Sequence, residues 1–295
     1  MKVLFSNIKR NTKLFFKDKG LFFTSLITPL ILLVLYASFL SNVYESSFRQ
    51  VFEQTGVSAT DKQISGLVGG QLMSSLLAVS CVTVSFCSNM LMVQDKFNGA
   101  YKDLMMTPLK RSSLALSYYI STTISTLIIC LLAFVACLVY VGAVGWYLTA
   151  GDILLLLLDI FLLVTFGTAL SSVINFFLSS QGQVSAVGSI VSSCYGFICG
   201  AYMPLSSFGA GLRNAVMFLP GTYGTALIRN HSLNSVIETL PAQAVKGLKD
   251  SIDCNIYFFG SKVEVGTMYL IISLSIVLLI SVYVLINKFC KTTKK

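Results

Sequence analysis

The chain has 295 residues, of which 55% are hydrophobic and 11% are charged, and its mean hydropathy is +0.79. Soluble domains carry about 25% charged residues, so most of this chain does not face water. The formal net charge is +9, but the basic residues cluster at the ends of apolar runs, where they meet anionic lipid headgroups. This placement argues against nucleic acid as a partner. Seven of the eight cysteines lie in or beside apolar runs, which indicates packing rather than a disulfide framework.

Residues 1–20 predict an amphipathic helix that lies on the membrane surface. Apolar residues recur at helical spacing between lysines and arginines, from Val3 to Phe16. The alternative is a simple cluster of charges that only sets the topology. The next apolar run has no small-residue cleavage site after a short core, so we expect it to remain as a membrane anchor.

Six apolar stretches are long enough to cross a membrane, because about 20 helical residues span a hydrocarbon core of ~30 Å. They cover about residues 21–41, 66–93, 114–142, 153–178, 184–203 and 266–287. Ser, Gly and Cys dilute the fifth stretch, a composition typical of a helix packed among other helices. The sequence therefore predicts one all-α membrane domain, residues 1–295, with six transmembrane helices.

The orientation follows from the placement of Lys and Arg. Residues 1–20 hold six basic residues, residues 94–112 hold four, and the tail from Lys288 holds four with no acid. In the 42–65 loop, acidic residues outnumber basic ones. With six spans all three basic segments fall on one side, which predicts that both termini are cytoplasmic.

The 204–265 loop is then extracellular. Its residues 212–230 are moderately apolar but interrupted by Pro220 and Gly221. This stretch is too short to span, so we expect short interfacial or re-entrant helices, whose backbone groups must be satisfied by protein or by a water-filled cavity.

Motifs for catalysis are absent from the sequence. It contains neither the P-loop pattern GxxxxGK[ST] nor HExxH. Its one histidine, His231, is expected to be a solvated loop residue, and Cys194 and Cys199 lack metal-ligand spacing. The chain by itself is therefore predicted to be non-catalytic, with no metal site.

The 94–112 segment is the most informative part of the sequence. A charged run is followed by Gly99, a short amphipathic stretch and Thr107-Pro108. Because a residue before proline disfavours the helical region, this pattern predicts a short helix that ends near Thr107 and lies across the cytoplasmic end of the spans. The alternative is an ordinary loop between spans.

This segment resembles the coupling helix of ABC-2-type transporter permeases. The residues that match the family pattern are Gly99, Asp103, Leu104, Thr107 and Pro108. Ala100 replaces the usual Thr, and Asp95-Lys96 stands for the usual Glu-Lys/Arg. The order of the spans and three further stretches also look like that family: residues 200–204, 220–223 and 227–229.

The resemblance implies a mechanism. Two copies of the chain, or this chain and a paralogous permease, would form the membrane core of an exporter in the plasma membrane, bound to cytosolic ABC ATPase subunits that hold ATP and Mg²⁺. The spans around residues 66–93 and 184–203 would form the dimer interface and the pathway. The residues expected to couple to the ATPase are Asp95, Lys96, Gly99, Asp103, Leu104, Thr107 and Pro108.

Three other residues are candidates. Asp159 lies inside the fourth span, where a charge costs about 2.5–3.5 kcal/mol on insertion scales. It either lines the translocation pathway or is a boundary residue of a span that begins later. Gly196 and Gly200 form a GxxxG pattern that suggests close helix packing.

The substrate class is the least determined part of the prediction. The modest length favours a small drug, peptide, toxin or lipid-like molecule, with polysaccharide export as an alternative within the family. Outside the family, an ion-coupled secondary transporter would need acidic residues in its spans. Asp159 alone meets that condition in the predicted spans.

Overall fold

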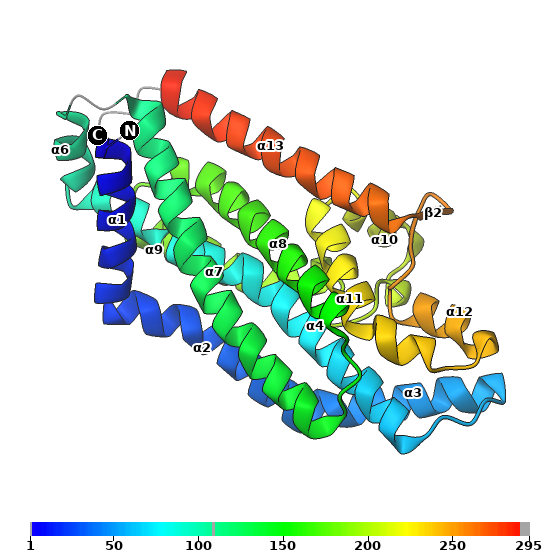
Figure 1. Ribbon diagram of the computed structural model, residues 1–295. Coiled ribbons are helices and arrows are strands. Elements are labelled where there is room, and N and C mark those ends of the chain that lie inside the picture. The colour runs from blue at the N-terminus through cyan, green and yellow to red at the C-terminus, as the bar shows by residue number, and fades with distance from the viewer. Residues whose placement is uncertain (1, 108–109, 290–295) are drawn as a thin grey trace.

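The computed structural model describes residues 2–107 and 110–289. In this part of the chain, long helices form a bundle, and the only sheet is one short two-stranded hairpin (Figure 1). The predicted all-α membrane fold is confirmed. The beginning of α1 (Lys2–Lys17), helix α6 (Ala100–Met105) and the end of α13 (Val265–Phe289) lie at one end of the bundle, which we call the α6 end (Figure 1).

Helix α1 is amphipathic, as predicted. Phe15 is 1% exposed whereas Phe5 is 72% exposed, and the buried side packs against α7 (Arg111–Val144). Asp18 separates α1 from α2 (Lys19–Leu35), because its carboxylate accepts a hydrogen bond from the Leu21 amide at 3.1 Å and caps α2.

The first predicted span, 21–41, continues further than expected. Helix α2 runs through a π-helical turn (Tyr36–Leu40) into α3 (Ser41–Thr55), where the sequence predicts a loop. Tyr44, Phe48 and Phe52 explain the difference: they recur every four residues and are all buried. An apolar stripe at that spacing stabilises a helix packed on the bundle.

Helix α4 (Asp61–Ser88) lies at the centre of the bundle and corresponds to the second predicted span. It packs against α2, α7, α8, α9 and α11, and 89% of its most apolar window is buried inside the chain. Most of its surface is thus covered by helices of the same chain, and the expectation that this span contributes to an interface between two copies stays a prediction.

The third, fourth and sixth predicted spans are confirmed as α7, α8 (Ala150–Phe176) and α13. The fifth predicted span, 184–203, forms α9 (Gln181–Ile198), which is shorter than expected and ends in a turn at Gly200, whose φ is +75°. Among the described residues, five helices are long and apolar enough to cross a membrane, and α9 is not one of them.

The opposite end of the bundle, which we call the hairpin end, holds α3, α12 (Ala242–Ser251) and the strands β1 (Ile256–Phe258) and β2 (Ser261–Val263) (Figure 1). The helices expected within 212–230 are α10 (Ala210–Val216) and α11 (Pro220–Glu238). Pro220 is the first helical residue of α11, where proline is well tolerated.

Helix α11 is not interfacial but buried. It packs against α4, α8 and α13, and thirteen of its residues are buried. It begins beside residues near the middle of α8 and α13 (Phe166 and Ser275) and ends at the hairpin end, where the Thr239 carbonyl accepts a hydrogen bond from Gln63 at 3.1 Å. Helix α11 thus extends from the middle of the bundle to the hairpin end.

Candidate functional site

The predicted coupling segment forms two short helices at the α6 end. Helix α5 (Met90–Phe97) follows α4 after a break at Asn89, and α6 follows after Gly99. Gly99 has φ +83°, which a residue with a side chain adopts only at a cost, although a Cβ there would meet no atom within 4 Å. Thr107 is exposed, and Pro108 lies outside the described residues.

Asp95 does not face solvent. It is 7% exposed and accepts hydrogen bonds from Arg10 of α1 (Nη1 to Oδ2, 2.9 Å) and from the hydroxyl of Tyr118 of α7 (2.5 Å). Burial lowers the pKa of Arg10, but the hydrogen bond and charge of Asp95 outweigh that effect and the net pKa is raised. Asp95 therefore ties α5 to two other helices.

Lys96 is bound to α8. Its ammonium donates to the carbonyl oxygens of Asn175 (3.2 Å) and Phe176 (2.8 Å) and lies 5.1 Å from the centre of the Phe176 ring. A cation at the carboxyl end of a helix is favourable because the last carbonyls are unsatisfied and carry partial negative charge. About one turn earlier in α8, the hydroxyl groups of Ser171 and Ser172 accept hydrogen bonds from the side-chain amide of Asn89 at 3.0 Å.

Part of the remaining segment faces outward. Asp103 and Thr107 are exposed, as are the apolar side chains of Phe97 (63%) and Met106 (88%). Leu104 is half-buried and packs against the cluster that contains Tyr101 and Tyr118. Among the predicted coupling residues that the structure describes, Asp95 and Lys96 are thus anchored to other helices, whereas Asp103 and Thr107 are exposed on and beside α6.

Asp159 belongs to a polar cluster in the other half of the molecule. Its carboxylate is 2% exposed, accepts a hydrogen bond from the Tyr269 hydroxyl at 2.6 Å and lies 2.6 Å from Nδ1 of His231. Helix α8 begins at Ala150, earlier than the predicted 153. That Asp159 is a boundary residue of the membrane span stays the alternative interpretation. Its role in a pathway stays a prediction.

His231 corrects the sequence interpretation. It lies in α11 rather than in a loop, and its side chain is 12% exposed rather than solvated. Sequence reasoning missed it because its partners, Asp159 and Tyr269, lie far away along the chain. A second contact joins the same helices, since Asp152 of α8 accepts hydrogen bonds from Thr149 and from Ser235 of α11.

Arg229 is the largest fully buried side chain described. It donates to the Gly200 carbonyl at 2.7 Å and lies 3.5 Å from Oδ2 of Asp253, which in turn accepts from the Leu205 amide at 2.7 Å. Burial raises the pKa of Asp253, and the charge of Arg229 partly opposes that rise. An arginine within an apolar helical stretch, after Leu227 and Ile228, is the sequence signal that could have indicated this pair.

Of the two GxxxG glycines, only Gly196 is helical. A Cβ at Gly196 would lie 2.2 Å from the ring of Tyr202, which packs across it from the turn after α9. Gly200 forms that turn, and the amides of Ala201 and Tyr202 both donate to the Gly196 carbonyl. The pattern therefore serves the end of α9 within one chain. Among the described residues, no cluster of three His, Cys, Asp or Glu side chains could hold a metal ion.

Comparison with known proteins adds one match. The model of the family described as "ABC-2 type transporter" matches residues 2–231, which includes α1, the segment from Asp95 to Thr107, Asp159 and His231. No curated protein matches the chain.

Proposed function

Because the chain belongs to the ABC-2 type transporter family, and is thus a membrane-embedded permease subunit of an ABC transporter, we propose that it works in an ATP-driven exporter. In this proposal a cytosolic ATPase subunit holds ATP and Mg²⁺, and its motion reaches the spans through residues 95–108. The substrate is a small drug, peptide, toxin or lipid-like molecule, and the complex lies in the plasma membrane.

The proposed topology has six spans, with α9 as the fifth and both termini in the cytoplasm. The supporting observation is that the beginning of α1 and the end of α13 lie at the α6 end (Figure 1), together with the basic segments of the sequence. Tyr283 of α13 donates to the sulfur of Met92 in α5 at 3.2 Å, which fixes the end of α13 beside the coupling segment.

The observation that supports the proposed coupling is that residues 95–107 include both residues anchored to other helices and exposed residues. Asp95 and Lys96 bind α1, α7 and α8, whereas Asp103, Met106 and Thr107 remain open to a partner. A force applied to the exposed residues would therefore pass to three helices at once. This is the arrangement expected of an element that an ATPase moves to bias two states of the membrane domain.

A second permease, identical or paralogous, completes the proposed pathway. Since most of α4 is covered by its own chain, the contact between permeases falls mainly on helices that keep an uncovered apolar face. Helix α9 qualifies, because Ile190 and Phe197 are 62% and 49% exposed. Helix α2 also keeps an uncovered face, with Ile31 and Val34 exposed by 53% and 65%.

The experiment that tests the proposal is purification of the tagged chain from native membranes under mild conditions, followed by identification of the proteins that accompany it. We expect an ATPase in about one-to-one ratio. Asp103→Lys should abolish its recovery, because the reversed charge lies on the exposed part of α6. The matched control is Glu264→Lys at the hairpin end, which also reverses an exposed charge. Equal recovery with both variants would refute the coupling assignment.

The cluster of Asp159, His231 and Tyr269 favours a second candidate, an ion-coupled transporter, because titratable groups inside a membrane domain often bind the coupling ion. Vesicles without ATP and with an imposed proton gradient separate the two. Transport that needs the gradient and is lost in Asp159→Asn would support this candidate, whereas transport that needs ATP alone would reject it.

A further inference from the structure

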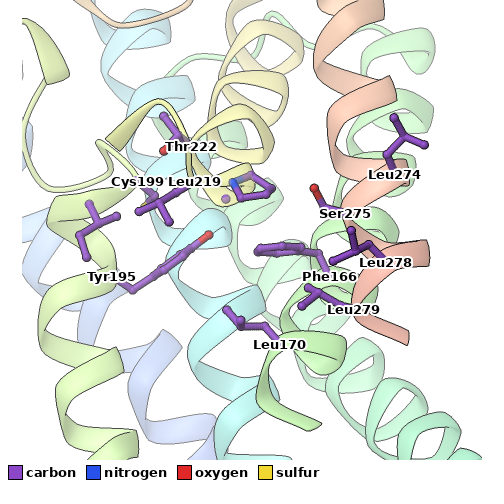
Figure 2. Close-up of a pocket in the computed structure, with 13 residues that line it drawn as sticks. Phe166, Leu170, Tyr195, Cys199, Leu219, Thr222, Leu274, Ser275, Leu278 and Leu279 are labelled. Atoms are coloured by element: carbon purple, nitrogen blue, oxygen red, sulfur yellow. The ribbon is translucent and has the colours of Figure 1, made fainter. Parts of the chain in front are cut away.

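A cavity of about 440 Å³ lies where α11 begins, between α8, α9 and α13 (Figure 2). The cavity exists because α11 starts inside the bundle at Pro220. No part of α11 therefore fills the space that these three helices enclose before its first turn. The volume is within the range of about 300–1,000 Å³ found for small-molecule sites.

The wall of the cavity is hydrocarbon. Three of its polar side chains use their hydroxyl and thiol groups within their own chain: Thr222 donates to the Val216 carbonyl at 3.1 Å, Ser275 to the Ile271 carbonyl at 2.7 Å, and Cys199 lies 3.8 Å from the Gly196 carbonyl. The hydroxyl of a fourth lining residue, Tyr195, is buried as well. The remaining lining is aliphatic and aromatic, and Figure 2 shows Phe166, Leu170 and Leu279 around its lower part. Apart from the single hydroxyl of Tyr195, such a wall has no polar group to bind water or a charged ligand.

The α13 side of the cavity is open to the surroundings of the bundle. Leu274 and Leu278 line it and are nevertheless 61% and 62% exposed. Only 17% of the most apolar window of α13 is buried, so this helix presents its surface to the membrane. The hydrocarbon core of the bilayer therefore reaches the opening of the cavity. This core consists mainly of phospholipid acyl chains, which are as apolar as the wall of the cavity.

We propose that the cavity binds one acyl chain of a bilayer phospholipid, which passes α13 and ends against Pro220 at the start of α11. The bound chain would contact α11 and two candidate spans, α8 and α13, at the same time. This site goes beyond the proposed export function and depends on neither the ATPase nor the transported substrate.

The experiment uses the full chain, purified and reconstituted in phosphatidylcholine vesicles with a trace of phosphatidylcholine that carries a diazirine in the middle of one acyl chain. After illumination, mass spectrometry of peptides locates the label. We expect it to concentrate on lining residues such as Phe166 and Tyr195, and a free fatty acid with the same diazirine should label them less at equal membrane content.

Two serines of α13 provide a matched pair of variants. Ser275 and Ser281 both donate to the carbonyl four residues earlier at 2.7 Å, but Ser275 lines the cavity and Ser281 is exposed on the helix surface. Ser275→Phe fills the cavity. Loss of contact for only two methylene groups corresponds to a fall of about tenfold in occupancy, which the labelling of Phe166 should show. Ser281→Phe should leave that labelling unchanged.

Three results would overturn the proposal: label spread evenly over the exposed leucines of α13, equal labelling of Phe166 in Ser275→Phe and the parent chain, or labelling by the free fatty acid alone. If Ser275→Phe does not yield folded protein, Leu278→Trp blocks the opening instead. Its exposed position leaves room for the larger ring. Unchanged labelling of Phe166 in this variant would equally reject the site.

Discussion

The two ends of the molecule use charged residues in different ways. At the α6 end, the Arg10 side chain is 33% exposed while it binds Asp95, and the pair holds a short helix whose outer surface stays free. At the hairpin end, Arg229 and Asp253 have side chains exposed by only 1% and 7%, and they hold α11 inside the bundle. One end thus leaves the outer surface of a short helix exposed, and the other keeps a buried element in place.

The comparison implies different energetic consequences. Removing one partner of a buried pair leaves the other charge without solvent or counter-ion, whereas a partly exposed pair is compensated by water. We therefore expect substitutions at the hairpin end to reduce stability and substitutions at the α6 end to affect coupling more than stability.

The largest effect is expected for Arg229→Met, which leaves Asp253 and the Gly200 carbonyl without their partner. Breaking a buried pair costs about 3–5 kcal/mol. The measurement is the temperature at which the detergent-solubilised chain loses its monodisperse peak in size-exclusion chromatography. Arg213→Met is the control, since Arg213 lies nearby in α10 and is exposed. If both variants lower that temperature equally, the buried pair has no special role.

A smaller loss is expected for Asp159→Leu. It leaves the half-buried side chains of His231 and Tyr269 without this acceptor, and hydrogen bonds to charged groups contribute about 1.5–3 kcal/mol. Tyr269→Phe removes only one of the two contacts and should cost less in the same thermal assay. A stability of Asp159→Leu equal to that of the parent chain would show that α8 and α11 are held by apolar packing alone.

The smallest effect on stability is expected at the α6 end. Asp95→Asn weakens the contacts with Arg10 and Tyr118, and after allowance for the solvent around Arg10 the cost is about 1 kcal/mol or less. The exposed Asp103→Asn should be neutral within about 0.5 kcal/mol. The informative readout is transport in the assembled complex, where Asp95→Asn should leave ATP hydrolysis intact but reduce transport. Loss of both activities together would indicate a defect of assembly instead.

The sequence predicted the long helices because their signal is local. A run of apolar residues is sufficient to define α7, α8 and α13, and the expected bounds agree with the structure within three residues at each end. Helix α3 was predicted as a loop because its stripe of Tyr44, Phe48 and Phe52 is dispersed among polar residues, which lowers the mean hydropathy although one face is buried.

The candidate sites were predicted less completely, for the opposite reason. Gly99 and Asp103 were located by a local pattern, but the partners of Asp95 lie in α1 and α7 and those of Asp159 in α11 and α13. No local pattern contains such contacts. His231 illustrates the limit, since a histidine beside Asn230 and Ser232 has the appearance of a loop residue until α8 is packed against it.

The burial of α4 has a consequence for how the protein is made. Helix α4 is synthesised early, but some of the helices that pack on it are synthesised much later. Gly70, for example, is packed against Leu233 of α11, and a Cβ at Gly70 would lie 2.6 Å from that leucine. At about 5–20 residues per second, roughly 10–30 s pass between synthesis of the two residues. During that interval the serines and Gln71 of α4 must be tolerated by lipid, by the translocon or by a chaperone. The polarity of this central helix therefore has to be compatible with its biogenesis as well as with the finished fold.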